Sequence, residues 1–293
     1  MGTAIIPQTQ DTAAGKEPSS FLMSFRRALP VFATTLFQMN AILSSSPVNL
    51  ARLMVVAGDD PAMTANLLRE AASADRDVVC DQLLDAIIGV GIRRLQAMML
   101  RTPLMTGAEA HSTAYMAWRN HSALAAVLAE SLARQSEALV PARARICGLL
   151  HDIGKLPLLL RNVGDGCAEP ARSDDPVPDD AGNSHGEIGH ELAQAWGFSS
   201  ALCDCIRQHH AGQTEMGESL LAVVTAADRV CHRCGVTMDV EMTGIYRELP
   251  LEEILAGALS WLSAEQAQAA ADHVRRAYET WQRSHPSARC VSL

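Results

Sequence analysis

Imidazole and carboxylate side chains lie on the apolar faces of five predicted helical segments. Residues i, i+3, i+4 and i+7 of a helix share one face. His121 accordingly lies in line with Trp118 and Leu124, while His151 and Asp152 interrupt a segment that is apolar nearly all round. The residues placed in this way are His121, His151, Asp152, His185, His209, His210 and Asp228.

A single histidine on an apolar face is most often a core residue whose ring bonds a backbone carbonyl. Buried aspartates are harder to explain, because an unpaired carboxylate inside a protein costs several kcal/mol. Neutral imidazoles and carboxylates are ligands of divalent metals, and the cation offsets the carboxylate charge. These residues therefore predict a divalent metal site. Its many imidazoles favour Fe, Mn or Zn over Mg, which prefers oxygen ligands.

The remaining histidines are not expected to be metal ligands. His190 lies on a polar helical face, although it follows His185 closely in the sequence. His273 and His285 lie in polar C-terminal surroundings, and the positions of His111 and His232 are ambiguous. These residues serve as an internal control for the assignment of helical faces.

The composition predicts an all-α protein. Apolar residues make up 48% of the 293 residues but aromatic residues only 4%, whereas strands are rich in aromatic and β-branched residues. The net charge of -9 argues against duplex nucleic acid as a partner, because binding it requires a broad basic face. A local cluster of arginines could still hold a nucleotide.

No secretory signal and no membrane span are expected. The start MGTAIIPQTQ lacks a basic stretch followed by an apolar run, and no segment is long and apolar enough to cross a bilayer. Eight cysteines without such a signal predict reduced thiols and a cytoplasmic location. Cys203 with Cys205, and Cys231 with Cys234, favour buried packing thiols over zinc ligands, because a single CxxC is a weak zinc signal.

The chain divides into four predicted regions. Residues 1–20 are polar and predict a flexible N-terminal segment. Residues 21–110 predict an N-terminal helical subdomain, and residues 111–235 predict a metal-site subdomain with a Gly-, Pro- and Asp-rich loop at 163–184. Residues 236–293 predict a C-terminal helical segment that could cap the domain, form a homodimer contact or complete the core.

Apolar periodicity within these regions predicts helices and no convincing strand pair. Asp59-Asp60-Pro61 marks a helix start, because proline suits the first helical turn, and Gly89-Val90-Gly91 marks a turn. The helices expected in the metal-site subdomain cover residues 112–132, 141–160, 184–196, 199–210 and 216–233.

The order and spacing of the candidate ligands, with the pair His151–Asp152 inside GLLHDIGKL, resemble the HD superfamily of metal-dependent phosphohydrolases. More narrowly, residues 27–233 resemble the HDOD proteins, the HD-related output domains of bacterial signalling. The likeness includes ALPVFATTLFQMNAIL, DDPAMTANLLREA, VGIRRLQAMML and GHELAQAWGF, in the family's order. The resemblance implies an HD-domain-like helical array.

The resemblance also implies roles for individual residues. His151 and Asp152 match the signature pair, with Asp152 as the carboxylate that bridges two metal ions. The remaining candidate ligands match the other positions of two-metal HD enzymes. Lys155 matches a lysine that approaches the substrate phosphate in related phosphodiesterases, although a solvated cation near a helix end would explain it equally well. Asp152 and Lys155 are therefore the candidate catalytic residues.

Two functions are consistent with this resemblance. Many HDOD proteins have lost several ligand positions and act as interaction modules, which favours a signal-transduction output module. Its partner would be a signalling protein or a small phosphorylated or nucleotide ligand. The alternative is a phosphohydrolase, either a phosphodiesterase or a nucleotide phosphatase, that uses a hydroxide activated by two metal ions.

Two further features bear on the alternative. The sequence HHAGQTEMGES lacks the Gly-Tyr-Pro motif of related cyclic-di-GMP phosphodiesterases, which argues against that substrate. The candidate phosphate contacts are Arg93, Arg94 and Arg119.

Overall fold

The computed structural model describes residues 23, 25–74, 81–105, 113–164, 185–210, 217–237, 249–286 and 288. In these residues the secondary structure is helical, apart from an isolated parallel bridge between Val31 and Leu104. The predicted all-α class is confirmed. The N-terminal segment 1–20, most of the loop 163–184, and His111 lie outside the described residues. No helix in the described ranges is long and apolar enough to cross a membrane.

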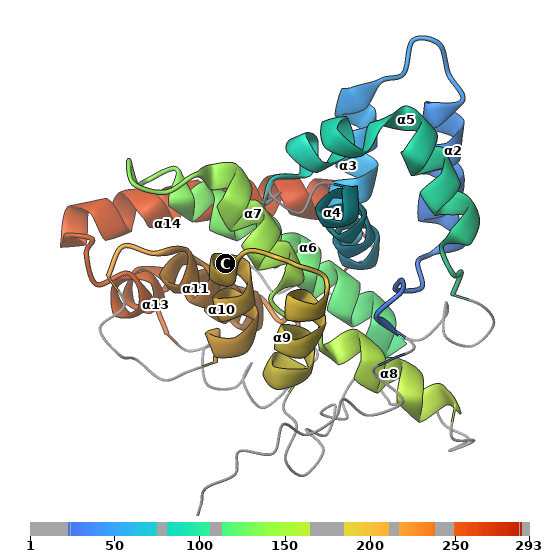
Figure 1. Cartoon of the computed structure of the whole chain (residues 1–293). Helices are drawn as coiled ribbons and strands as arrows, with labels where there is room; N and C mark the ends of the chain where they lie inside the picture. Colours follow the sequence, from blue (N-terminus) through green and yellow to red (C-terminus); the bar gives the residue numbers. More distant parts are fainter. Residues whose placement is uncertain are drawn as a thin grey trace, which may run out of the picture.

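The region predicted as an N-terminal subdomain contains α2 (Ala33–Leu43), α3 (Leu50–Gly58), α4 (Pro61–Ala74) and α5 (Leu83–Arg101), at the upper right of Figure 1. Helix α4 begins at Pro61, as predicted, and Oδ1 of Asp60 accepts a hydrogen bond from the Met63 amide at 2.9 Å. Helix α5 is kinked at Gly91, whose φ of 74° is accessible to glycine at little cost. The turn expected there is therefore a kink inside one helix.

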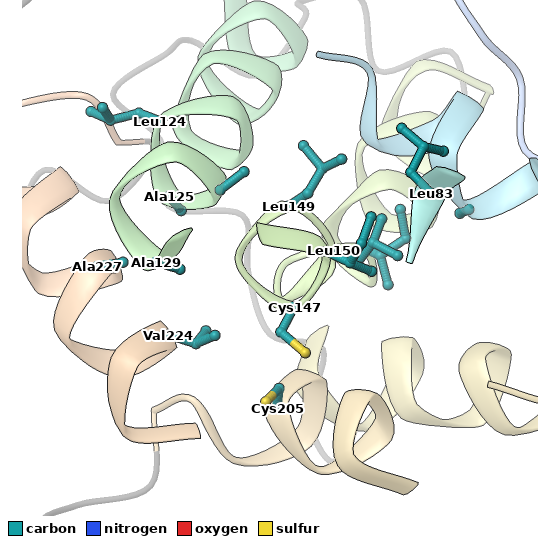
Figure 2. Packing of buried hydrophobic residues seen from close by; sticks show 14 of the residues in the cluster. Leu83, Leu124, Ala125, Ala129, Cys147, Leu149, Leu150, Cys205, Val224 and Ala227 are labelled. Atoms are coloured by element: carbon teal, nitrogen blue, oxygen red, sulfur yellow. The ribbon is translucent and has the colours of Figure 1, made fainter. Parts of the chain in front are cut away.

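The second half of the chain is built around α6 (Thr113–Ala133) and α7 (Pro141–Leu150), which pack closely against each other. A Cβ atom on Gly148 would lie only 2.6 Å from the Ala125 carbonyl oxygen, so only glycine permits this approach. Figure 2 shows Ala125 and Ala129 facing this packed region, with Val224 and Ala227 of the neighbouring helix nearby. Small residues therefore bring the ligand-bearing helices close together.

Around this pair lie α9 (His185–Ala195), α10 (Ser200–Gln208) and α11 (Leu220–Arg233). Helix α10 contacts α9, and α11 contacts both α6 and α7. Ser199 and Ser219 cap α10 and α11 by accepting hydrogen bonds from backbone amides three residues later. The helices predicted in these stretches are confirmed.

The prediction of a single helix over residues 141–160 was wrong. The chain leaves α7 after Leu150, turns through residues 151–154, and re-enters a helix in α8 (Lys155–Gly164). Pro157 explains the break, because a proline inside a continuous helix clashes with the carbonyl four residues earlier. As the third residue of α8 it needs no amide hydrogen. The break places His151 and Asp152 on a turn.

The C-terminal segment completes the core. Helix α13 (Leu251–Ala258) packs against α11, and α14 (Ala264–Ser284) packs along α6. Tyr278 and Trp281 of α14 are buried. Among the three roles considered for this segment, these contacts correspond to completion of the core.

The cysteines of the described residues are free and buried. Figure 2 shows the sulfur atoms of Cys147 and Cys205 facing each other between α7 and α10. The hydrogen bond with the Cys147 thiol, together with burial, raises the pKa of Cys205. These thiols are packing residues, as expected.

Candidate metal centre

The candidate ligands converge into two adjacent groups. The inner group contains His121, His151 and Asp228, and all of these side chains are buried. The outer group contains Asp152, His185, His209 and His210. Within each group the potential ligand atoms lie within 4.8 Å of one another. The structure thus brings together every residue that the helical faces singled out.

The outer group contains a regular triangle of donor atoms. Nε2 of His185 lies 3.3 Å from Nε2 of His209, and each of these nitrogens lies 3.3 Å from Oδ1 of Asp152. Donors at roughly 2.1 Å from a common tetrahedral ion lie about 3.4 Å apart. His210 completes the group, and its side chain is 39% exposed. The outer group is therefore the solvent-accessible side of the centre.

The inner group is more compact and fully enclosed. Nε2 of His121 lies 3.1 Å from both Nε2 of His151 and Oδ1 of Asp228. Nε2 of His151 lies 3.6 Å from the same oxygen. Oδ2 of Asp152 lies 3.5 Å from His121 and 3.6 Å from His151. These separations are also close to those of donors around one ion.

Asp152 lies between the two groups. Its Oδ1 atom faces His185 and His209 of the outer group, and its Oδ2 atom faces His121 and His151 of the inner group. The indole of Trp118 donates a hydrogen bond to the Asp152 carbonyl at 3.0 Å and so holds the backbone of the turn. Asp152 is therefore the residue that could contact an ion in either group.

The orientation of three imidazoles is set by backbone carbonyls. A carbonyl oxygen can only accept a hydrogen bond, so the ring nitrogen that contacts it must carry the proton. The other nitrogen of a neutral ring then presents a lone pair to the centre. The contacts join Nδ1 of His121 to Val236 O at 2.8 Å, Nδ1 of His151 to Gly148 O at 2.8 Å, and Nδ1 of His209 to Ile206 O at 2.9 Å.

Glycines allow the outer helices to approach the turn at residues 151–154. A Cβ atom on Gly154 would lie 1.9 Å from the His185 carbonyl oxygen and 2.6 Å from the Gly189 amide nitrogen. A Cβ atom on Gly186 would lie 3.0 Å from the Arg207 carbonyl oxygen. Helix α9 therefore packs closely between the turn and α10, and this packing places His185 beside His209.

The protonation states suit metal ligands. Burial lowers the pKa of His121 and lowers the pKa of His209 to about 4, so both rings are neutral at pH 7. Burial opposes ionisation of the two carboxyls, but Lys155 and His151 hold the pKa of Asp152 well below its usual range. The neighbouring imidazoles, above all that of His232, likewise hold the pKa of Asp228 well below its usual range. Neutral imidazoles and ionised carboxylates are the forms that bind metal.

His151 differs from the other rings. Burial is the largest single influence and lowers its pKa, but Asp152 and Asp228 together raise this pKa above its ordinary value. Nε2 of His151 and Nε2 of His121 face each other at 3.1 Å while both Nδ1 atoms donate to carbonyls. The two facing Nε2 atoms can therefore share either a proton carried by His151 or a cation.

A further observation indicates that the donor set fits a divalent metal. Oδ1 of Asp152 and Oδ1 of Asp228 are buried and lack a hydrogen-bond partner in the described part of the chain. A buried carboxylate oxygen without such a partner is costly. A cation shared with the imidazoles would satisfy both oxygens.

Lys155 is buried, with 8% of its surface exposed. Its Nζ atom lies 2.6 Å from Oδ2 of Asp152. The alternative of a solvated cation is therefore wrong.

Sequence reasoning missed the position of His232. This residue is buried, and its Nε2 atom lies 3.3 Å from Oδ1 of Asp228. The spacing of four residues between Asp228 and His232 on an apolar helix was the signal that could have identified it.

The other residues considered lie elsewhere. His190 contacts the Cys203 carbonyl oxygen at 3.2 Å and belongs to neither group, and His273 is exposed on α14. Arg94 pairs with Glu70 at 3.3 Å, and the guanidinium of Arg119 lies over the Phe32 ring at 5.5 Å. Arg93 is exposed on α5.

The fold is similar to those of known proteins. The MmoQ response regulator from Methylococcus capsulatus str. Bath has a TM-score of 0.60 and 22% identity, covering 84% of this chain and 98% of that chain. A virulence factor from Campylobacter jejuni subsp. jejuni has a TM-score of 0.58 and 14% identity, covering 88% of this chain and 95% of that chain. Identities this low show likeness of fold alone.

The sequence is 26% identical over 195 residues to a protein of Treponema pallidum (strain Nichols) described as uncharacterized. The similarity covers 62% of this chain and 37% of that protein, so the chain spans little more than a third of that relative's length. Residues 29–212 match the family described as the HDOD domain, which ends before Asp228 and His232. Because this match covers more than half of the sequence, the chain belongs to the HDOD family.

Proposed function

We propose that this protein is a signal-transduction module of the HDOD type that holds two divalent metal ions, one in each ligand group. The observation that carries the proposal is the convergence of the candidate ligands into two adjacent groups, within each of which the potential ligand atoms lie within 4.8 Å of one another. The division of the two Asp152 oxygens between the groups supports a bridge between two ions. The metals that suit this donor set are Fe, Mn and Zn.

A protein partner is supported by the distribution of exposed apolar residues. Large exposed hydrophobic side chains in the described residues are concentrated in the N-terminal subdomain and in the residues flanking it, with Val140 as the exception in the second half. Exposed apolar residues mark an interaction surface when they form a contiguous patch. They are Met23, Phe37, Leu50, Val55, Leu84, Ile88, Ile92, Leu100 and Leu104.

This division suggests how a signal would pass. The N-terminal helices would bind the signalling protein, and the outer group would bind a small phosphorylated or nucleotide ligand. Helix α4 contacts both α6 and α7, which connects the two halves. The free buried cysteines support a reducing compartment, the cytoplasm.

Hydrolysis of a phosphate ester is the second candidate, favoured by the accessible outer group and by Lys155. When bound, two divalent ions in such a centre supply an activated water and neutralise phosphate charge. His210 and His185, the more exposed ligands, line the approach to the centre. Lys155 orients Asp152 from inside, and its positive charge lowers the electrostatic cost of a bound phosphate.

Metal content and turnover distinguish the two candidates. The purified protein is expected to contain two metal ions per chain, and Asp152→Ala is expected to lose both. Turnover of bis-p-nitrophenyl phosphate or of cyclic dinucleotides with added Mn²⁺, abolished in Asp152→Ala, would establish the phosphohydrolase. Two bound ions without turnover would favour the signalling module. A wild-type protein that binds no divalent metal would contradict both candidates.

A further inference from the structure

His232 lies outside both ligand groups but contacts a carboxylate of the inner group. Its Nε2 atom lies 3.3 Å from Oδ1 of Asp228, one turn earlier on α11. The ring is 1% exposed, and its centroid lies 5.6 Å from that of His121. His232 also follows the residues that match the HDOD family, so the family match assigns it no role.

The other fully buried ligands are each held by a group that is not itself a ligand. Backbone carbonyls orient the three buried histidine ligands, and the ammonium of Lys155 contacts the carboxylate of Asp152. An aspartate needs such a contact, because rotation of its carboxylate about χ2 is only weakly restricted. For Asp228, the corresponding contact comes from His232.

The orientation of Asp228 matters because its two oxygens face different groups. Oδ1 lies 3.1 Å from Nε2 of His121, whereas Oδ2 lies 4.0 Å from Nδ1 of His210 in the outer group. A rotated carboxylate would withdraw Oδ1 from the inner group. The imidazole of His232 lies on the side of Oδ1, 3.3 Å from it, where it can oppose this rotation.

The same end of α11 supports a second inner ligand. Gly235 has a φ of 69°, and the Val236 amide donates to the Cys231 carbonyl at 3.1 Å, which closes the helix with a glycine turn. The turn brings the Val236 carbonyl to Nδ1 of His121 at 2.8 Å. One short segment therefore orients both His121 and Asp228.

We propose that His232 is a positioning residue that holds Asp228 Oδ1 toward His121 and His151 and thereby sets the affinity of the inner ion. This inference rests on the proposed metal centre. Residues that orient metal ligands typically change metal affinity by about 10–100-fold when they are replaced.

Two substitutions test the proposal. His232→Leu removes the polar contact in a buried position. His232→Gln instead places an amide nitrogen, a hydrogen-bond donor, close to the position that Nε2 of His232 occupies. The measurements are the stoichiometry of bound Zn²⁺ and Mn²⁺ and their dissociation constants by chelator competition, with thermal melts to verify folding. His273→Leu, an exposed histidine of α14, is the control. If the leucine variant fails to fold, His232→Asn, whose amide is too short to reach Asp228, replaces it.

We expect His232→Leu to lower the affinity for the inner ion by about 10–100-fold and to leave the affinity for the outer ion unchanged. The glutamine variant should remain close to wild type, and the control should not differ. Wild-type affinity in His232→Leu would overturn the proposal while the metal centre stands. An equal loss in the glutamine and leucine variants would also overturn it, because His232 would then be a ligand itself. A wild-type chain without bound metal would overturn both this inference and the proposed function.

Discussion

The ammonium of Lys155 lies 2.6 Å from Oδ2 of Asp152, and both side chains are buried. This oxygen also faces the inner histidines, so Lys155 contacts an oxygen that would be available to an inner ion. In the metal-free protein, Lys155 is the closest positive charge to Asp152. The Lys155–Asp152 pair therefore bears both on the stability of the protein without metal and on its affinity for metal.

Replacing Lys155 should destabilise the metal-free protein more than the metal-loaded one. Lys155→Met leaves the Asp152 carboxylate buried without its ammonium, which typically costs about 3–5 kcal/mol. Bound metal should recover much of this loss, because its positive charge would neutralise the buried Asp152 carboxylate in place of the ammonium. Urea unfolding with EDTA and with Mn²⁺ measures the difference. Arg134→Met, which breaks an exposed ion pair with Glu130, should cost under about 1 kcal/mol in both conditions.

Single ligand substitutions should separate the two groups. His121→Ala should remove the inner ion and lower the metal content toward one per chain, while His210→Ala should weaken only the outer ion, since its ring is partly exposed. His190→Ala should retain the wild-type content, because this ring contacts the Cys203 carbonyl. Metal analysis after dialysis provides the measurement. Equal metal loss from the His121 and His190 variants would show that the assignment of faces is wrong.

The metal-free protein should lose stability as the pH falls. Burial lowers the pKa of His209 from 6.5 to about 4 in the folded state, so between these values the unfolded chain binds more protons. The free energy of unfolding therefore increases with pH in this window, and the contribution of His209 is lost as the pH falls through it. For a shift of this size the loss by pH 4 approaches about 3 kcal/mol.

Urea unfolding in EDTA between pH 7 and pH 4 measures this dependence. His209→Asn removes the titrating ring, so its free energy of unfolding should fall less steeply over the same range. Parallel curves for the wild type and the variant would contradict the attribution to His209.

Gly154 should tolerate no side chain. A Cβ atom there would lie 1.9 Å from the His185 carbonyl oxygen, so Gly154→Ala must displace α9. We expect weaker binding of the outer ion and a lower melting temperature. Gly89→Ala is the matched control, because a Cβ atom at Gly89 meets nothing within 4 Å, and alanine should stabilise a helix by up to about 1 kcal/mol. Thermal melts and metal titrations of both variants measure these effects. Equal melting temperatures and metal affinities for the two variants would contradict the requirement for glycine at position 154.

The sequence by itself determined which side chains face inward. The helical period is local, so the apolar neighbours of His121, His185 and Asp228 were enough to assign their faces. The same rule excluded His190. Composition alone predicted the all-α class.

Only the tertiary structure decided how these side chains combine. Distances between helices depend on packing, such as the contact of Gly148 with the backbone of α6, and no periodicity encodes them. The break at residues 151–154 placed His151 and Asp152 on a turn, which allowed the two Asp152 oxygens to face different groups. Burial of Lys155 and the contact of His232 with Asp228 likewise depend on segments brought together from distant parts of the chain.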